Sequence, residues 1–156
     1  MSRLERPLLA KRITLTGDIA LRAELSLRIK TKSATWEPVD FLVDPGTEMT
    51  TFPAARAKQL GIPLPRKPVP RLSITGRNVE VRAGLIRARI DGMDLTEYVF
   101  PCYFIGDPDA PFDPKQPPKF PRNLLALSGV VTKLRILFDG TPTAEAPHGI
   151  LVVERI

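Results

Sequence analysis

The chain of 156 residues has very few of the side chains that hold metals or form disulfides. Cys102 is its only cysteine and His148 its only histidine. An internal disulfide needs two cysteines, and zinc sites draw on several cysteine and histidine ligands. We therefore expect no internal disulfide, no Cys/His zinc site, no two-histidine site and, more generally, no metal.

Glycine is also sparse and widely spaced. The ten glycines never come closer than eight positions apart. Loops that cradle phosphate groups need closely spaced glycines, as in G-x-G-x-x-G and the P-loop. Nucleotide binding is thereby disfavoured, and we expect no cofactor.

Long apolar runs are absent as well. No stretch approaches the roughly 18 to 20 apolar residues of a spanning helix, and residues 1–9 are charged and lack the apolar centre of a secretory signal. The length suits a single domain covering residues 1–156. We expect a cytoplasmic protein without a membrane partner, with a flexible N-terminal segment at residues 1–11.

Proline, in contrast, is abundant. The chain has 17 prolines, which is roughly twice the usual share. Seven lie between Pro101 and Pro121, and five between Pro53 and Pro70. Because proline lacks an N–H and fixes φ, such stretches suit connections rather than long helices. We predict a Pro-rich loop at residues 106–122 and an all-β chain with one or two short helices.

Hydrophobic periodicity agrees with a β fold. From Ala20 to Thr31 apolar and polar residues alternate strictly, which is typical of a half-buried strand. Around Gly84 the apolar residues change from odd to even positions, which suggests a bulge or bend there. Further strands are predicted at residues 12–16, 39–43, 69–74, 79–90, 97–105, 133–138 and 149–153. Their spacing favours a barrel or sandwich.

Two short helices are predicted from local signals. Residues 53–60 begin with a proline, continue with good helix formers and end before Gly61. Residues 122–128 end before Gly129, which suits a helix C-terminus.

Asp44 is the strongest candidate for chemistry. It follows the apolar residues Phe41, Leu42 and Val43 and opens the string Asp44-Pro45-Gly46-Thr47. An acid directly after an apolar strand is half-buried by position. An ordinary β-turn is the alternative, since Asp-Pro-Gly is also a common turn sequence.

The wider pattern resembles the retropepsin-like aspartic proteases, whose motif is apolar-apolar-Asp-Thr/Ser-Gly-Ala/Ser. The string at residues 41–47 is followed by the helical segment 52–63, and far downstream residues 123–130, NLLALSGV, look like the family's Leu-Leu-Gly segment and precede a strand at residues 133–140. The resemblance covers roughly residues 20–153.

The resemblance implies a retropepsin-like barrel and a homodimer in which each subunit gives one catalytic aspartate, here Asp44. Two facing carboxyls cannot both ionise cheaply, so they share a proton and work as acid and base on a water molecule. The implied activity is hydrolysis of peptide bonds without metal or cofactor, with a peptide or protein as substrate.

Three residues depart from the family pattern: Pro45, Thr47 and Ala126. Pro45 stands where the family has Thr or Ser and has neither the hydroxyl nor the N–H of those residues. Two hypotheses follow, an aspartic endopeptidase and a dimeric peptide-binding or scaffold module with weak or no catalysis.

Substrate contacts are expected from the turn and from a flap. Gly46 and Thr47 follow the catalytic position. By its order in the chain, the segment 72–79 would form the covering hairpin, with its turn near residues 76–78. The flap residues expected to meet substrate are Ile74, Thr75, Gly76 and Arg77.

The positive net charge of the chain is interpreted as a solvated surface rather than a binding site for nucleic acid. The net charge is +6, yet Arg22, Arg28, Arg87 and Arg89 alternate with apolar residues along predicted strands, as on a solvated sheet face. Aromatic residues are few and no nucleic-acid motif occurs. We therefore expect no nucleic-acid partner.

Overall fold

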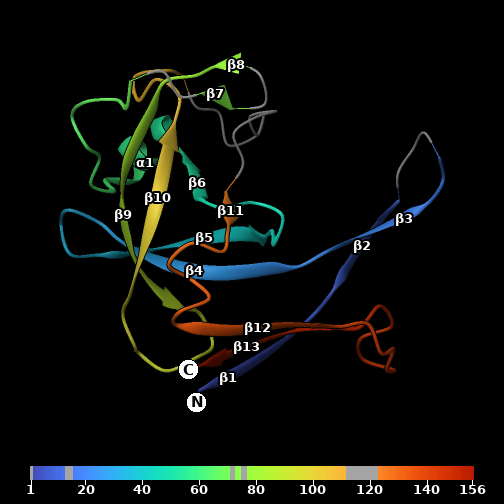
Figure 1. Cartoon of the computed structure of the whole chain (residues 1–156). Helices are drawn as coiled ribbons and strands as arrows, with labels where there is room; N and C mark the ends of the chain where they lie inside the picture. Colours follow the sequence, from blue (N-terminus) through green and yellow to red (C-terminus); the bar gives the residue numbers. More distant parts are fainter. Residues whose placement is uncertain (1, 13–15, 71–72, 75–76, 112–122) are drawn as a thin grey trace.

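A six-stranded closed barrel forms the body of the protein in the computed structural model, which describes residues 2–12, 16–70, 73–74, 77–111 and 123–156 (Figure 1). The strand order around the barrel is β10-β6-β11-β5-β4-β9. These strands are β4 (Glu24–Lys30), β5 (Trp36–Val43), β6 (Thr50–Pro53), β9 (Val81–Ile90), β10 (Tyr98–Ile105) and β11 (Leu124–Leu125). The expected all-β barrel is confirmed.

The short strand β11 joins distant parts of the barrel. It runs parallel to β5 and antiparallel to β6, and so lies between the two strands that flank Asp44 in the sequence. The predicted helix at residues 122–128 is therefore wrong: Leu124 and Leu125 extend because they complete the barrel, and tertiary pairing overrides their local preference.

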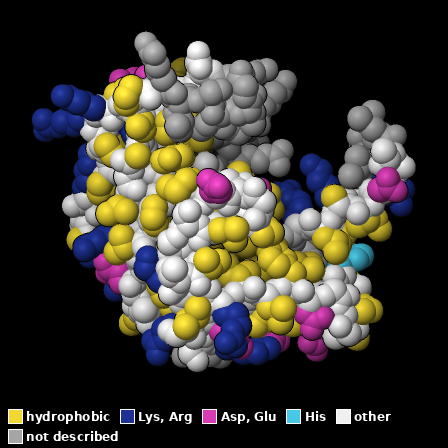
Figure 2. Space-filling model, in the orientation of Figure 1, with side chains coloured by type: hydrophobic (Ala, Val, Ile, Leu, Met, Phe, Trp, Pro, Cys, Tyr) yellow, Lys and Arg dark blue, Asp and Glu magenta, His cyan; other side chains and the backbone are white. Residues whose placement is uncertain are grey.

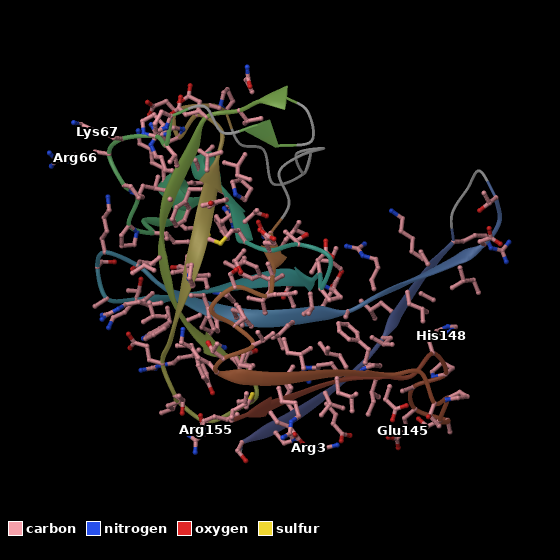
Figure 3. The ribbon with its side chains drawn as sticks, viewed as in Figure 1. Arg3, Arg66, Lys67, Glu145, His148 and Arg155 are labelled. Atoms are coloured by element: carbon pink, nitrogen blue, oxygen red, sulfur yellow. The ribbon has the colours of Figure 1, made fainter. Side chains whose placement is uncertain are left out.

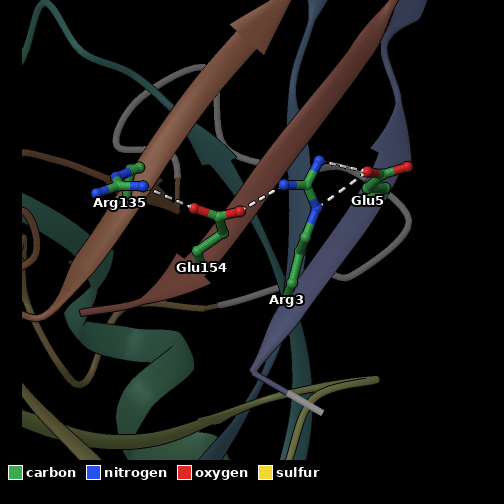
Figure 4. A network of polar contacts seen from close by, with 4 residues as sticks. All are labelled: Arg3, Glu5, Arg135 and Glu154. Carbon is green, nitrogen blue, oxygen red and sulfur yellow. Dashed lines mark hydrogen bonds and ion pairs between the residues drawn. The ribbon is translucent and has the colours of Figure 1, made fainter.

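A second sheet brings the two ends of the chain together. Its order is β1-β13-β12, with β1 at Arg3–Pro7, β12 at Leu134–Asp139 and β13 at Ile150–Arg155. Glu154 on β13 binds both Arg3 on β1 and Arg135 on β12 (Figure 4). Strand β1 thus finds its backbone partners on β13, and the flexibility of residues 1–11 stays a prediction.

The barrel core follows the alternation seen in β4. Leu25, Leu27 and Ile29 are buried, and the phenylalanines Phe41, Phe52 and Phe104 pack in the same core. Along β9 the buried positions change from odd, at Val81, to even, at Ile86 and Ala88, but the expected bulge near Gly84 is not present. Ala83 and Leu85 are exposed, the β9–β10 pairing continues without a bulge, and a Cβ at Gly84 would lie 3.0 Å from Phe104. Gly84 thus belongs to the inward face.

The helix predicted at residues 53–60 is confirmed. Helix α1 spans Ala54–Leu60, Pro53 precedes it in an extended conformation, and Gly61 ends it with φ of 75°. Ala54 and Ala57 are fully buried, so α1 packs on the barrel with two of its three alanines.

Among the described residues, two further hairpins lie outside both the barrel and the terminal sheet. The first, which we call the arm, pairs β2 (Leu9–Arg12) with β3 (Ile19–Arg22) and projects from the body (Figure 1). The second pairs β7 (Ser73–Ile74) with β8 (Arg77–Asn78) and lies at the top of the view in Figure 1.

Candidate active site

Asp44 stands at the end of a buried strand, where three segments meet. The Val43 N–H donates to the Ala23 carbonyl at 2.8 Å, and the Asp44 N–H donates to the Leu125 carbonyl at 3.0 Å. The backbone at Asp44 is thus tied to both β4's N-terminal side and β11. A half-buried carboxylate is positioned here by the barrel itself.

The carboxylate is held by its own loop. The Gly46 N–H donates to Oδ1 at 2.9 Å, and the Thr47 hydroxyl donates to Oδ2 at 2.8 Å. A Cβ at position 46 would lie 3.2 Å from Oδ1, so glycine allows this close approach. Both carboxylate oxygens therefore have donors, and Pro45 supplies neither of them.

The loop that carries these donors is fixed against the segment expected to resemble Leu-Leu-Gly. The Leu127 N–H donates to the Thr47 carbonyl at 3.2 Å, and the Ser128 N–H donates to the Glu48 carbonyl at 2.8 Å. The Ala126 N–H donates to the hydroxyl of fully buried Thr50 at 3.1 Å. Two motifs about 80 residues apart thus form one structural unit, which the sequence predicted only by their order.

An open pocket of about 630 Å³ borders Asp44. Asp44 is its only acid among the described lining residues, and Lys11 and Arg22 are its bases. Continuing the β4–β5 register by two residues places Arg22 opposite Asp44, and its guanidinium pairs with Glu24 at 3.1 Å. The pocket is lined by Leu8, Lys11, Ala20, Leu21, Arg22, Ala23, Leu42, Val43, Asp44, Pro45, Phe138 and Gly140. One chain thus supplies one carboxylate to this pocket.

The predicted flap is described only in its backbone. Ser73 pairs with Asn78 and Ile74 with Arg77, so a hairpin does form in this segment. Thr75 and Gly76, together with the side chains of Ile74 and Arg77, lie outside the described residues. Their contact with substrate stays a prediction, as do the substrate roles of Gly46 and Thr47.

The chain's cysteine and histidine are not among the residues that line the pocket. Burial raises the pKa of the Cys102 thiol, which leaves it protonated and unreactive. His148 lies with Glu145 in the connection between β12 and β13 (Figure 3). In the described ranges no three His, Cys, Asp or Glu side chains are placed to hold a metal ion. The absence of a metal or cofactor stays a prediction.

Basic side chains are spread over the molecule. Arg66 and Lys67 project from the loop after α1, whereas Arg3 and Arg155 lie on the terminal sheet (Figure 3). Arg155 pairs with Asp94 at 3.1 Å. Figure 2 likewise shows cationic groups scattered between apolar and neutral ones on this face. That nucleic acid is not a partner remains an expectation.

The sequence did not reveal the part of the pocket made by the arm. Leu21 belongs to an alternation that predicts burial, yet it is exposed. Gly17, with φ of 74°, next to Asp18 after an expected strand, is a turn signal that would have suggested the hairpin.

The fold is similar to that of a solved structure. A retropepsin-like aspartic protease from Rickettsia conorii superposes with a TM-score of 0.53 over 98% of this chain and 92% of that chain, at 13% sequence identity. No protein-family model matches the chain, and no curated protein does. The fold of this chain is therefore retropepsin-like. No helix in the described part is long and apolar enough to cross a membrane.

Proposed function

We propose that this chain is an aspartic endopeptidase that works as a homodimer in the cytoplasm. The observation that carries the proposal is the Asp44 carboxylate, held by Gly46 and Thr47 at the end of β5 and open to a pocket. A retropepsin-like fold with one such carboxylate per chain is half of a two-carboxylate site. A two-fold axis supplies the second copy.

The reaction begins with one Asp44 ionised and its partner protonated. The carboxylate takes a proton from water as the water oxygen attacks the peptide carbonyl carbon, and the protonated partner gives its proton to the carbonyl oxygen. A geminal diol results. When its C–N bond breaks, the first carboxyl gives its proton to the leaving nitrogen and one diol hydroxyl returns a proton to the second. Both aspartates then regain their starting states.

The donors on Asp44 support its positioning. Hydrogen bonds from the Gly46 N–H and the Thr47 hydroxyl fix the orientation of the carboxylate. Because Pro45 can give no N–H, the Thr47 hydroxyl is the side-chain donor that this loop provides. The proposal therefore assigns Thr47 to positioning and Asp44 to catalysis.

A second candidate function rests on Pro45. Where the family has Thr or Ser, Pro45 offers no group to connect two subunits beneath the carboxylates. If the two carboxylates are held less firmly for this reason, the chain would be a dimeric peptide-binding module that cleaves slowly or not at all.

A peptide-library digest separates the two functions. The protein and Asp44→Asn are incubated with diverse peptides between about pH 4 and about pH 7, a range that begins near ordinary carboxyl pKa values. The proposal expects cleavage that Asp44→Asn abolishes. Cleavage that persists in Asp44→Asn contradicts it. Peptide binding without cleavage, with cleavage gained in Pro45→Thr, favours the binding module.

A further inference from the structure

The arm presents an apolar face that nothing in the described part of the chain covers. Its strand β3 continues directly into β4 through Ala23. Leu25 and Leu27 on β4 and Ala23 itself are buried, whereas Leu21 and Ile19, the next residues on the same side, are 51% and 57% exposed. The stripe that forms the barrel core thus extends beyond the barrel into solvent.

This exposure has a structural cause. Strand β5, the neighbour of β4, ends at Val43, so β3 extends past it and pairs only with β2 among the described strands. Leu21 lies opposite Ala10 and Ile19 opposite Arg12. A two-stranded ribbon alone is marginally stable in water. Directly opposite residues share a face, so this side of the ribbon holds Ile19, Leu21 and Ala10 together with Arg12. Its exposed apolar part favours a partner surface.

The arm also forms one wall of the site. Ala20, Leu21 and Arg22 line the pocket that contains Asp44, and Phe138 lines it from β12. Leu137 and Phe138 are themselves exposed, on a strand that pairs only with β13 in the described sheet. Figure 1 shows the arm and β12 spreading apart to the same side of the barrel. Any surface that closes over Asp44 from this side meets both.

We propose that the Ile19 and Leu21 face of the arm is covered by a second copy of this chain. The inference rests on the proposed function, which requires a second Asp44 on the open side of this pocket. In a two-fold dimer the same surface is used twice, so each arm packs against the other protomer. The arm is then the element that holds the two half-sites together.

The charges on the arm also favour a second copy of this chain as its partner. The arm carries Lys11, Arg12 and Arg22 against one acid, Asp18, and the loop that follows Asp44 carries the exposed Glu48. A basic arm lying across the partner's site places cations beside an acidic residue of the partner, which favours this pairing over contact between two arms alone.

Sedimentation velocity tests the proposal. The variant Ile19→Glu with Leu21→Glu puts charge on the covered face, and Leu95→Glu is the matched control, because Leu95 is 78% exposed and lies between β9 and β10. The expected result is a dimer for the wild-type chain and for Leu95→Glu, and a dissociation constant raised at least about 100-fold for the arm variant. A circular dichroism spectrum and melting curve show whether the arm variant folds.

A second measurement does not depend on a disruptive variant. Because Cys102 is buried, Leu21→Cys gives the chain one accessible thiol. Its rate of modification should fall severalfold as protein concentration rises and the dimer forms. The thiol of Leu95→Cys should react at one rate throughout. Any one of three results overturns the proposal. The two thiols show the same dependence of modification rate on concentration, the wild-type chain is a monomer at about 100 μM, or the arm variant dimerises as well as the wild type.

The outcome separates this inference from the proposed function. If Asp44→Asn abolishes cleavage while the arm variant remains an active dimer, the peptidase stands and the role of the arm is rejected. If the arm variant is monomeric and the wild-type dimer cleaves nothing, the arm stands and the peptidase is rejected.

Discussion

At the scale of single residues, the Asp44 loop accommodates a proline where the family has Thr or Ser. Pro45 removes a hydroxyl and an N–H from the position next to the acid. The structure nevertheless gives Asp44 two donors, the Gly46 N–H and the Thr47 hydroxyl. The apolar strand before Asp44 and the family resemblance together identified this residue. Which neighbours hold it depends on the dihedral angles of the turn, which the sequence pattern does not specify.

Replacing Thr47 by valine keeps the shape of the side chain and removes its hydroxyl. A hydrogen bond to a charged group contributes about 1.5 to 3 kcal/mol, and about 1.4 kcal/mol changes a rate tenfold. We expect Thr47→Val to lower kcat about tenfold or more with a smaller change in KM, because the hydroxyl donates to Oδ2 of Asp44 and orients the carboxylate. Steady-state kinetics over a range of pH measures this.

Thr132→Val is the matched control, since Thr132 is exposed and distant in sequence from Asp44. Its kinetics should equal those of the wild type. A Thr47→Val enzyme with unchanged kcat and an unchanged pH profile would show that the hydroxyl does not position the carboxylate.

At the scale of elements, periodic segments were predictable and segments made by distant pairing were not. Strand β4 and helix α1 follow from alternation and from Pro53 with Gly61. Strands β1 and β11 do not, because their partners are β13 and the pair β5 and β6. Local patterns do not encode such partners. The same holds for the arm's share of the pocket.

The connection between β12 and β13 depends on Gly149. Its φ is 93°, and a Cβ there would lie 2.1 Å from the Asp139 carbonyl oxygen. We expect Gly149→Ala to lower the free energy of unfolding by about 3 kcal/mol. Gly140→Ala, in the same connection with nothing within 4 Å of its added Cβ, should change it by less than about 0.5 kcal/mol. Urea denaturation compares the two, and equal losses would contradict the strain at Gly149.

Lys133 ties β10 to the turn before β12. Its Nζ donates to the Val99 carbonyl at 2.7 Å and to the Gly129 carbonyl at 2.9 Å. Lys133→Met keeps the aliphatic stem but removes both bonds, so we expect a loss of about 2 kcal/mol in unfolding free energy. Lys32→Met, at an exposed lysine, is the control and should stay near wild type. If Lys133→Met is as stable as the wild type, the two hydrogen bonds of Lys133 do not contribute to stability.

For the whole molecule, a site shared by two chains predicts dominant inhibition by an inactive chain. When wild type is mixed and re-equilibrated with an equal amount of Asp44→Asn, random pairing leaves about a quarter of the dimers with two intact carboxylates. Activity should fall to about a quarter of that of the same total amount of wild type. A fall to half, as simple dilution gives, would mean that each chain works alone.

Because β1 pairs with β13, the terminal sheet can form only late in the synthesis of the chain. Arg3 and Glu154 are bonded across 151 positions of the chain. At about 5 to 20 residues per second, a ribosome needs roughly 8 to 30 seconds to make the intervening chain. Throughout that time β1 has no strand to pair with, and the edge of β13 does not yet exist. A nascent chain can close its barrel once β11 has emerged, but its terminal sheet closes only after β13 has followed.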